Sequence, residues 1–233
     1  MRESVAVKHS VGHGRASTAS DVVQSFVRSV DTAKKSDRPY PNWLLAHCFP
    51  EDVVDDILAL PFDAPSLDGV SGKRELHNNT RKYFDMENRA LFPVCEAVAQ
   101  AFQDKRMTSH IEKVFGTNLN GTYLRIEFAQ DIEGFWLEPH TDLGVKVFTL
   151  LLYLSKDPSH KDLGTDIYDG DKKHVGRSAF TSNGAMVFVP SNNTYHGFEK
   201  RPIKGVRTSL IINYVTNEWR ARAQLSFPET PIA

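Results

Sequence analysis

The period of the apolar residues changes near residue 117, and this change limits the folds open to the chain. Before it, apolar residues recur at helical spacing, as at Leu91, Val94 and Val98. After it, residues 122–128 alternate between apolar and polar side chains. Further strands are predicted at 145–154, near 165–169, at 184–189 and at 206–215. Many short strands without helices between them indicate an antiparallel sandwich or barrel.

The first half of the chain is predicted to be mainly helical. Helices are expected through Val22–Val30, capped by Ser20-Asp21, from residue 51 to residue 60, and across 86–115, with a short strand at 43–46. The apolar stripes of these helices are the side chains that would pack on the outside of the later sheet.

The domain organisation follows from these periods. We expect a disordered tail over 1–18 and a single domain over 19–233, because no repeat or linker divides the rest. Within that domain, residues 19–117 form the mainly helical front and residues 118–220 the β core. The expected fold class is therefore α+β with a mainly β core.

Composition limits the kinds of partner that we expect the chain to bind. The chain has 233 residues, 40% of them hydrophobic, and a formal net charge of −1, so no global basic field favours nucleic acid. No apolar run is long enough to span a bilayer, and the N-terminus lacks the pattern of a signal peptide, so a cytoplasmic location is expected. Cys48 and Cys95 are far apart without metal-type spacing, which predicts two buried thiols.

A group of potential metal ligands lies at the mouth of one predicted strand. His140 and Asp142 are two residues apart and so point to the same side of an extended chain. On their own they would fit a turn equally well. His196, 56 residues further on, offers a second imidazole at the end of another strand. Two imidazoles and one carboxylate form the facial triad of non-heme Fe(II) oxygenases.

A cation and a hydroxyl follow the second histidine. Arg207 and Ser209 share one face of the last long strand, and together they suit a carboxylate ligand. The spacing of 11 residues from His196 to Arg207 implies a turn at 202–205. If Arg207 faced outward, Lys204 would take its place.

The ordered set His140-x-Asp142, His196 and Arg207-x-Ser209 resembles the 2-oxoglutarate- and Fe(II)-dependent oxygenases. The apolar run after the first pair is most similar to the prolyl-4-hydroxylase-type and related bacterial branch. The resemblance covers roughly residues 119–215.

What the resemblance implies is a double-stranded β-helix (jelly roll) with the N-terminal helices outside one sheet. It also implies Fe(II) on His140, Asp142 and His196, 2-oxoglutarate as cosubstrate with its far carboxylate on Arg207 and Ser209, O2 as co-reactant, and ascorbate as a stimulant. The reaction would convert 2-oxoglutarate to succinate and CO₂. Halogenating relatives replace the carboxylate ligand with a small residue, so Asp142 favours hydroxylation, with desaturation and ring formation as the alternatives.

Further residues are candidates for the cavity. Tyr123 and Arg125 lie on the polar face of the 122–128 strand, where they would line either a polar cavity near the cosubstrate or a solvent-exposed surface. Lys146, Trp136 and Asn213 are candidates for substrate contact, although Lys146 would equally reach solvent and a tryptophan is more often core.

The loop over 62–80 is long enough to serve function. Its end carries polar side chains that would form part of a substrate lid or a solvated connector. These are Lys73, Arg74, His77, Asn78 and Arg81.

Three functions are consistent with these patterns. The favoured one is a 2-oxoglutarate- and Fe(II)-dependent dioxygenase that hydroxylates an unactivated C–H bond of a small polar molecule, such as an amino acid, a sugar-acid or a biosynthetic intermediate. The alternatives are a prolyl-type hydroxylase of protein side chains and a non-catalytic jelly roll that binds a ligand. The sequence leaves the substrate and the oligomeric state open.

Overall fold

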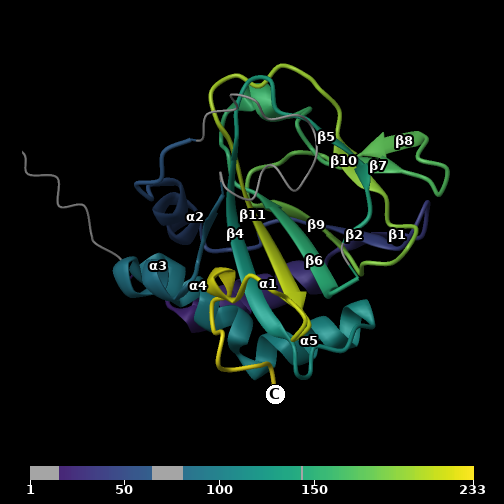
Figure 1. Cartoon of the computed structure of the whole chain (residues 1–233). Helices are drawn as coiled ribbons and strands as arrows, with labels where there is room; N and C mark the ends of the chain where they lie inside the picture. The colour runs from purple at the N-terminus through teal and green to yellow at the C-terminus, as the bar shows by residue number, and fades with distance from the viewer. Residues whose placement is uncertain (1–15, 65–80, 143) are drawn as a thin grey trace, which may run out of the picture.

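Two antiparallel sheets and a layer of helices make up the computed structural model, which describes residues 16–64, 81–142 and 144–233 (Figure 1). The larger sheet has seven strands in the order β1-β2-β9-β6-β11-β4-β3, and the smaller has four in the order β5-β10-β7-β8. The strands of the larger sheet are β1 Lys34–Ser36, β2 Asn42–Leu45, β3 Lys82–Tyr83, β4 Tyr123–Asp131, β6 Lys146–Tyr153, β9 Gly184–Phe188 and β11 Arg207–Val215. Those of the smaller sheet are β5 Leu137–His140, β7 Asp166–Tyr168, β8 His174–Arg177 and β10 His196–Phe198.

The helices come from the first half of the chain, as predicted. They are α1 Ala19–Asp31, α2 Glu51–Leu58, α3 Met86–Leu91, α4 Pro93–Gln103 and α5 Lys105–Phe115. Short 3-10 turns follow at Pro158–His160 and Arg222–Gln224. The cap of the first helix lies two residues before the expected Ser20, because the Thr18 side chain accepts from the Asp21 N–H while Asp21 bonds back to Thr18 in a capping box. The 86–115 pattern divides at Pro93 and Asp104 into three helices.

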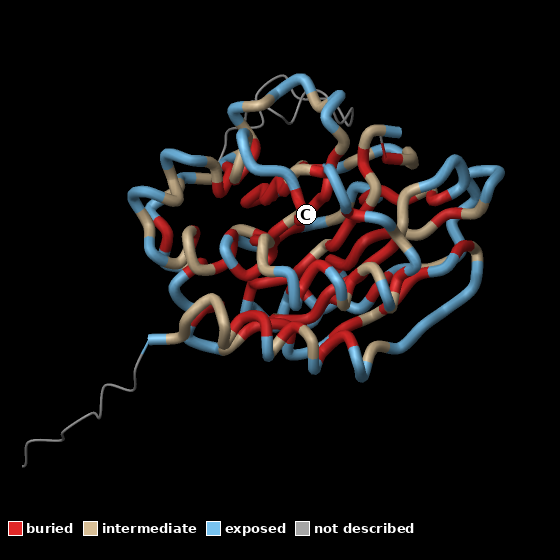
Figure 2. The backbone as a smooth tube through the Cα atoms, turned by 90° about the horizontal axis from the view of Figure 1, so that it is seen from below, coloured by how far each residue is buried: buried red, intermediate tan, exposed pale blue. Residues whose placement is uncertain are grey.

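The helices cover one face of the larger sheet. Leu124, Ile126 and Phe128 of β4 lie in the same buried cluster as the apolar residues of α1, α4 and α5. This main core runs as a continuous buried layer between helices and sheet (Figure 2). The prediction that apolar strand residues face helices is confirmed, and polar residues such as Arg125 and Glu127 lie buried on the opposite face, toward the smaller sheet.

All five strands predicted from long apolar or alternating runs are present. The sequence did not predict β1, β3, β5, β8 and β10, which have two to four residues each. Strands this short contain too few residues for a period to be read. They also include polar or charged side chains: the residues of β1 are Lys-Lys-Ser and those of β8 are His-Val-Gly-Arg.

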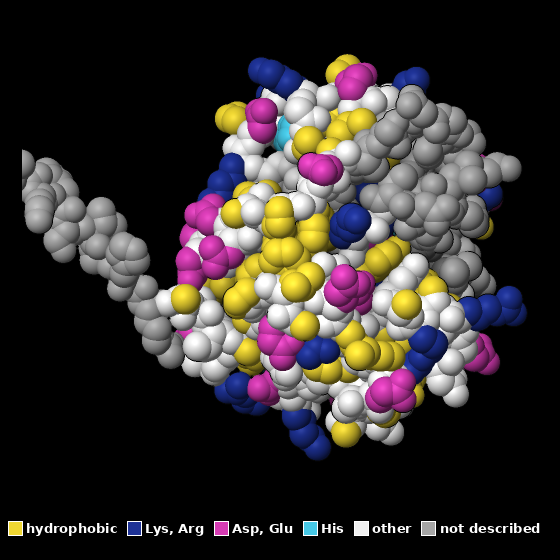
Figure 3. All heavy atoms as spheres, turned by 60° about the vertical axis from the view of Figure 1, so that its left-hand side comes forward, with side chains coloured by type: hydrophobic (Ala, Val, Ile, Leu, Met, Phe, Trp, Pro, Cys, Tyr) yellow, Lys and Arg dark blue, Asp and Glu magenta, His cyan; other side chains and the backbone are white. Residues whose placement is uncertain are grey.

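Two buried thiols and a partly apolar surface are further features of the fold. Cys48 and Cys95 are free and buried as predicted, and burial raises the pKa of each thiol to about 12. On α3, Met86 and Leu91 are exposed, and Figure 3 shows apolar side chains gathered among charged ones on the side that carries α2 and α3. None of the helices that the structure describes is both long and apolar enough to cross a membrane.

Candidate active site

Two adjacent strands of the smaller sheet carry the two histidines. His140 ends β5 and His196 begins β10, and the two residues are direct partners in the antiparallel ladder. Their ring centroids lie 4.4 Å apart. Gly197 permits this close pairing, because a Cβ at its position would lie 2.8 Å from the carbonyl oxygen of Leu137.

The backbone sets the orientation of both imidazoles. Nδ1 of His140 lies 2.8 Å from the carbonyl oxygen of Glu138, and Nδ1 of His196 lies 3.0 Å from that of Thr194. A carbonyl only accepts, so each Nδ1 carries the proton and donates. In the neutral ring the lone pair then belongs to Nε2, as metal-binding histidines require.

Asp142 completes a group that suits a metal ion. Potential ligand atoms of His140, Asp142 and His196 all lie within 4.8 Å of one another. The structure therefore brings together the three residues that the sequence singled out. Two neutral nitrogens and one carboxylate oxygen are a donor set that suits ferrous iron.

Two buried side chains hold the Asp142 carboxylate. The Lys146 ammonium donates to Oδ1 at 2.7 Å, and the Thr149 hydroxyl donates to Oδ2 at 2.6 Å. Lys146 was predicted to contact a substrate acid or to reach solvent. Instead, its side chain is 1% exposed and paired with Asp142.

Arg207 faces inward and lines the same cavity as the triad. Its Nε donates to the Leu163 carbonyl at 2.7 Å, and its Nη1 pairs with Asp131 on the neighbouring strand β4. The guanidinium also lies 4.8 Å from the Phe198 ring centroid. Lys204, the fallback for an outward-facing arginine, is exposed.

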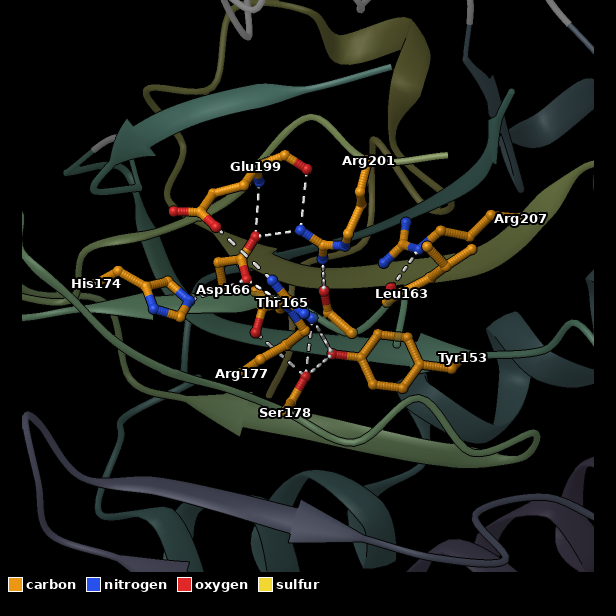
Figure 4. A network of polar contacts seen from close by, with 11 residues as sticks. Tyr153, Leu163, Thr165, Asp166, His174, Arg177, Ser178, Glu199, Arg201 and Arg207 are labelled. Atoms are coloured by element: carbon orange, nitrogen blue, oxygen red, sulfur yellow. Dashed lines mark hydrogen bonds and ion pairs between the residues drawn. The ribbon is translucent and has the colours of Figure 1, made fainter. Parts of the chain in front are cut away.

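Hydroxyl groups surround the Arg207 end of the cavity. Ser209, Tyr153 and Thr165 all contribute to its lining. The Tyr153 hydroxyl lies 2.8 Å from Thr165 Oγ1 and 2.6 Å from Ser178 Oγ (Figure 4). A guanidinium beside several hydroxyls forms a polar recess that suits one carboxylate group.

The predicted cavity residues of β4 lie elsewhere. Tyr123 and Arg125 are outside the described lining of the cavity. Tyr123 packs under the Arg222 guanidinium, 3.9 Å from its ring centroid. Arg125 is fully buried, and it forms an ion pair with Glu127 at 2.6 Å. The polar side chain at position 125 thus neither faces solvent nor reaches this cavity, whereas Asp131 at the end of the same strand lines it.

Asn213 lies behind the triad, also outside the described lining. It is fully buried, accepts from Arg125 at 3.3 Å, and donates to Thr149 Oγ1 at 2.9 Å. Thr149 in turn bonds to Asp142. Asn213 therefore connects the strand interior to the carboxylate of the triad.

The aromatic wall is one residue away from its predicted place. Trp136 is 37% exposed, whereas the ring of Phe135 lines the cavity. Of the candidate lid residues, Lys73, Arg74, His77 and Asn78 lie outside the described residues. Arg81 is described: it lines the cavity and pairs with Asp131 at 2.7 Å.

A second group of histidine and carboxylates lies nearby on β7, β8 and the residues after β10. Asp166, His174 and Glu199 have potential ligand atoms within 4.8 Å of one another. Asp166 already accepts from Arg177 and Arg201, each at 2.6 Å (Figure 4). Burial alone would raise the pKa of Asp166, but the bonds from Arg201, the Glu199 N–H and Arg177 outweigh it and hold that pKa below 3.8. Two arginines on one carboxylate make this an ion-pair cluster. Its members are too far apart in the sequence to be grouped from the sequence alone.

Some residues of the site were missed from the sequence, although a signal existed. Thr149 and Tyr153 lie on the same face of β6 within the 147–153 run, which is otherwise apolar, and both line the cavity. The same parity places Arg207 and Ser209 inward on β11. A lone polar residue in an apolar strand is the pattern that marks such positions.

Comparison with known proteins shows which fold the chain has. No protein-family model matches the chain, and no curated protein sequence matches it. Solved structures, in contrast, do match it. A prolyl-4-hydroxylase from Pseudomonas putida is 17% identical with a TM-score of 0.56, covering 84% of this chain and 99% of that one. A 2OG-Fe(II) oxygenase family oxidoreductase from Burkholderia pseudomallei is 14% identical with a TM-score of 0.54, covering 87% and 91%.

The chain has the fold of the 2-oxoglutarate/Fe(II) oxygenases. A Trichoplax adhaerens prolyl hydroxylase, solved with a peptide fragment of the hypoxia inducible factor oxygen degradation domain, is similar to the same extent. It is 14% identical with a TM-score of 0.55, covering 87% of this chain and 93% of that one. The resemblance inferred from the motifs is thus confirmed at the level of fold.

Proposed function

We propose that this protein is a 2-oxoglutarate- and Fe(II)-dependent dioxygenase that hydroxylates a C–H bond of a small polar molecule. The observation that carries the proposal is the shared cavity: His140, Asp142 and His196 line it together with Arg207 and Ser209. A metal-ligand triad and a carboxylate receptor in one cavity are what a chelating keto-diacid requires. The two sheets, in this proposal, form the jelly roll expected from the sequence.

The residues present fit both the metal and the cosubstrate. The triad offers two nitrogens and one oxygen, which leaves further positions on the ion for other ligands. When bound, Fe(II) would supply the activation of O2, which is the oxidant for both the substrate C–H bond and 2-oxoglutarate, and the latter would be released as succinate and CO₂. Arg207 would hold the far carboxylate through the guanidinium N–H groups that Leu163 and Asp131 do not engage, and Ser209, Tyr153 and Thr165 would add hydroxyl donors.

The protein side chains also keep water away from this end of the cavity. Phe135, Leu151 and Phe198 contribute apolar surface to the lining. Electrostatic contacts are stronger in such surroundings than in water. Arg207 therefore has the setting to bind a dianion and orient it toward the triad.

The substrate would enter on the outer side of Asp142. A depression of about 320 Å³ there is lined by Thr141, Ser191 and Asn192 as well as by Asp142 and Lys146. Side chains that offer hydroxyl and amide groups suit a small polar molecule. This lining is the feature that favours a small substrate.

Hydroxylation of a protein side chain is the second candidate. It is supported by the fold shared with the Pseudomonas putida prolyl-4-hydroxylase and with the peptide-bound Trichoplax adhaerens enzyme. The two candidates share the same metal and cosubstrate chemistry. They differ in which molecule stimulates turnover.

The test is succinate formation from 2-oxoglutarate by the Fe(II)-loaded protein, with one panel of amino acids and sugar-acids and one of proline-containing peptides. We expect stimulation by a small molecule, and its loss in His140→Ala. His110→Ala is the matched control, because His110 pairs with Asp31 on the helical side. Stimulation by peptides alone would favour the second candidate. No consumption of 2-oxoglutarate in either panel would contradict both.

A further inference from the structure

We propose that Lys146 is a positioning residue that supplies a built-in countercharge to the metal-binding carboxylate of Asp142 and thereby weakens the affinity of the site for divalent metal. The inference rests on the proposed function, since it takes His140, Asp142 and His196 as the metal ligands. It assigns to Lys146 a role in tuning the metal rather than in binding substrate.

The geometry of the contact carries the inference. Lys146 Nζ lies 2.7 Å from Asp142 Oδ1, and the two side chains are 1% and 2% exposed. Water therefore screens this ion pair poorly. Lys146 begins β6, four residues after Asp142, so the strand itself brings the ammonium to the carboxylate.

A chain of hydrogen bonds holds the carboxylate from its other side. Thr149 donates to Asp142 Oδ2 at 2.6 Å, and Asn213 donates to Thr149 at 2.9 Å. Arg125 donates to Asn213 at 3.3 Å. Because each oxygen of Asp142 has a different donor, rotation of the carboxylate would break at least one of these contacts.

The consequence for the metal follows from charge. A carboxylate that already shares its charge with an ammonium attracts a divalent ion less strongly, and the ammonium repels the ion at short range. Without a metal, the same ammonium stabilises a buried carboxylate that would otherwise be destabilising. Removal of the Lys146 charge should therefore tighten metal binding and destabilise the metal-free protein.

Two other roles for Lys146 predict different results. If Lys146 served only to hold Asp142 in the correct orientation, its loss would weaken metal binding. If it served only to bind a substrate acid, its loss would leave metal affinity unchanged. The sign of the change in metal affinity thus separates the three roles without any measurement of turnover.

The experiment is calorimetric titration of Mn(II) into the full-length chain, as wild type, Lys146→Met and Lys156→Met. Lys156 is the matched control: it is an exposed lysine, also in an ion pair with an aspartate, Asp55, and it lies outside the described lining of the cavity. We expect the Kd of Lys146→Met to fall about tenfold, which corresponds to about 1.4 kcal/mol. The Kd of Lys156→Met should equal that of wild type.

Thermal unfolding gives a second readout. The midpoint of Lys146→Met should fall in chelator and recover, relative to wild type, when Mn(II) is added. If Lys146→Met does not fold, Lys146→Gln keeps a hydrogen-bond donor to Asp142 without the charge, and the same fall in Kd is expected. An unchanged or higher Kd in the folded variant would overturn the inference alone. A wild type that binds no Mn(II) would overturn the proposed function as well.

Discussion

The two faces of the seven-stranded sheet carry different kinds of side chain on the same strands. On the outer face, Leu124, Phe148 and Leu210 pack against the helices in one apolar core. On the inner face of those three strands, Asp131, Thr149 and Arg207 are buried in ion pairs and hydrogen bonds. Because side chains alternate along a strand, one register fixes both faces at once.

The two faces differ in which substitutions they tolerate. Apolar contacts are non-directional, so the outer face depends on volume more than on identity. Each buried charge on the inner face needs a particular partner, as Arg207 needs Asp131 and Lys146 needs Asp142. Outer-face changes should therefore reduce stability and spare ligand binding, whereas inner-face changes should alter ligand binding as well as stability, because they leave a buried partner unpaired.

The largest effect is expected at the triad. His196→Ala removes one of three metal ligands, and succinate formation should fall by about a thousandfold or more. Far-UV circular dichroism should remain that of wild type, because β10 keeps its backbone pairing with β5 and β7. Retention of more than a tenth of the wild-type turnover would place the metal elsewhere.

A core substitution should act on stability alone. Phe148 is fully buried and contacts Phe115 and Tyr214, so Phe148→Ala should lower the free energy of unfolding by about 3–5 kcal/mol. Phe148→Leu, which keeps most of the volume, should lose less. Urea unfolding measures both. An accompanying loss of 2-oxoglutarate affinity in Phe148→Leu would break the separation between the faces.

At the cosubstrate end, the effect should appear in ligand binding. Arg207→Met removes the guanidinium proposed to bind the far carboxylate, so the Kd for 2-oxoglutarate should rise about a hundredfold. Arg207→Lys keeps the charge without the planar guanidinium and should lie between. Titration calorimetry with Mn(II)-loaded protein measures the change. Equal affinity in all three proteins would refute the assignment of Arg207.

The ion-pair cluster of the smaller sheet gives the smallest effect and a pH signature. The pKa of Asp166 is lowered in the folded protein, so its stabilising effect is complete above its ordinary value of 3.8 and is lost as pH falls through the lower folded pKa. Asp166→Asn should cost about 2 kcal/mol at pH 7. Urea unfolding of both proteins should show this difference shrinking below about pH 3.8. A difference that stays constant down to pH 2.5 would speak against the ion pairs.

Residues on long, regular strands were the ones that the sequence could place. The alternation in β4 and the apolar runs of β6 and β11 gave the sheet, and the parity of Arg207 and Ser209 gave one side of the cavity. The His-x-Asp pair and His196 were located from residue type and order alone. Such features are local in the chain, so one sequence contains them.

Contacts that depend on a turn or on neighbouring strands could not be placed in the same way. Lys146 was expected near substrate, and its pairing with Asp142 depends on how the chain turns between β5 and β6. Arg125 was expected near the cavity, but Tyr83, Glu127 and Asn213 enclose it instead. Parity gives the face of a strand, whereas the partner across the sheet is set by register and by other strands.

The measurement that tests the central claim most directly is anaerobic visible absorption of the protein with Fe(II), before and after 2-oxoglutarate is added. We predict a new charge-transfer band that requires both components, is absent in His140→Ala, and needs much higher 2-oxoglutarate in Arg207→Met. Iron bound without any such band would contradict the claim that the triad and Arg207 form one site for a chelating keto-diacid.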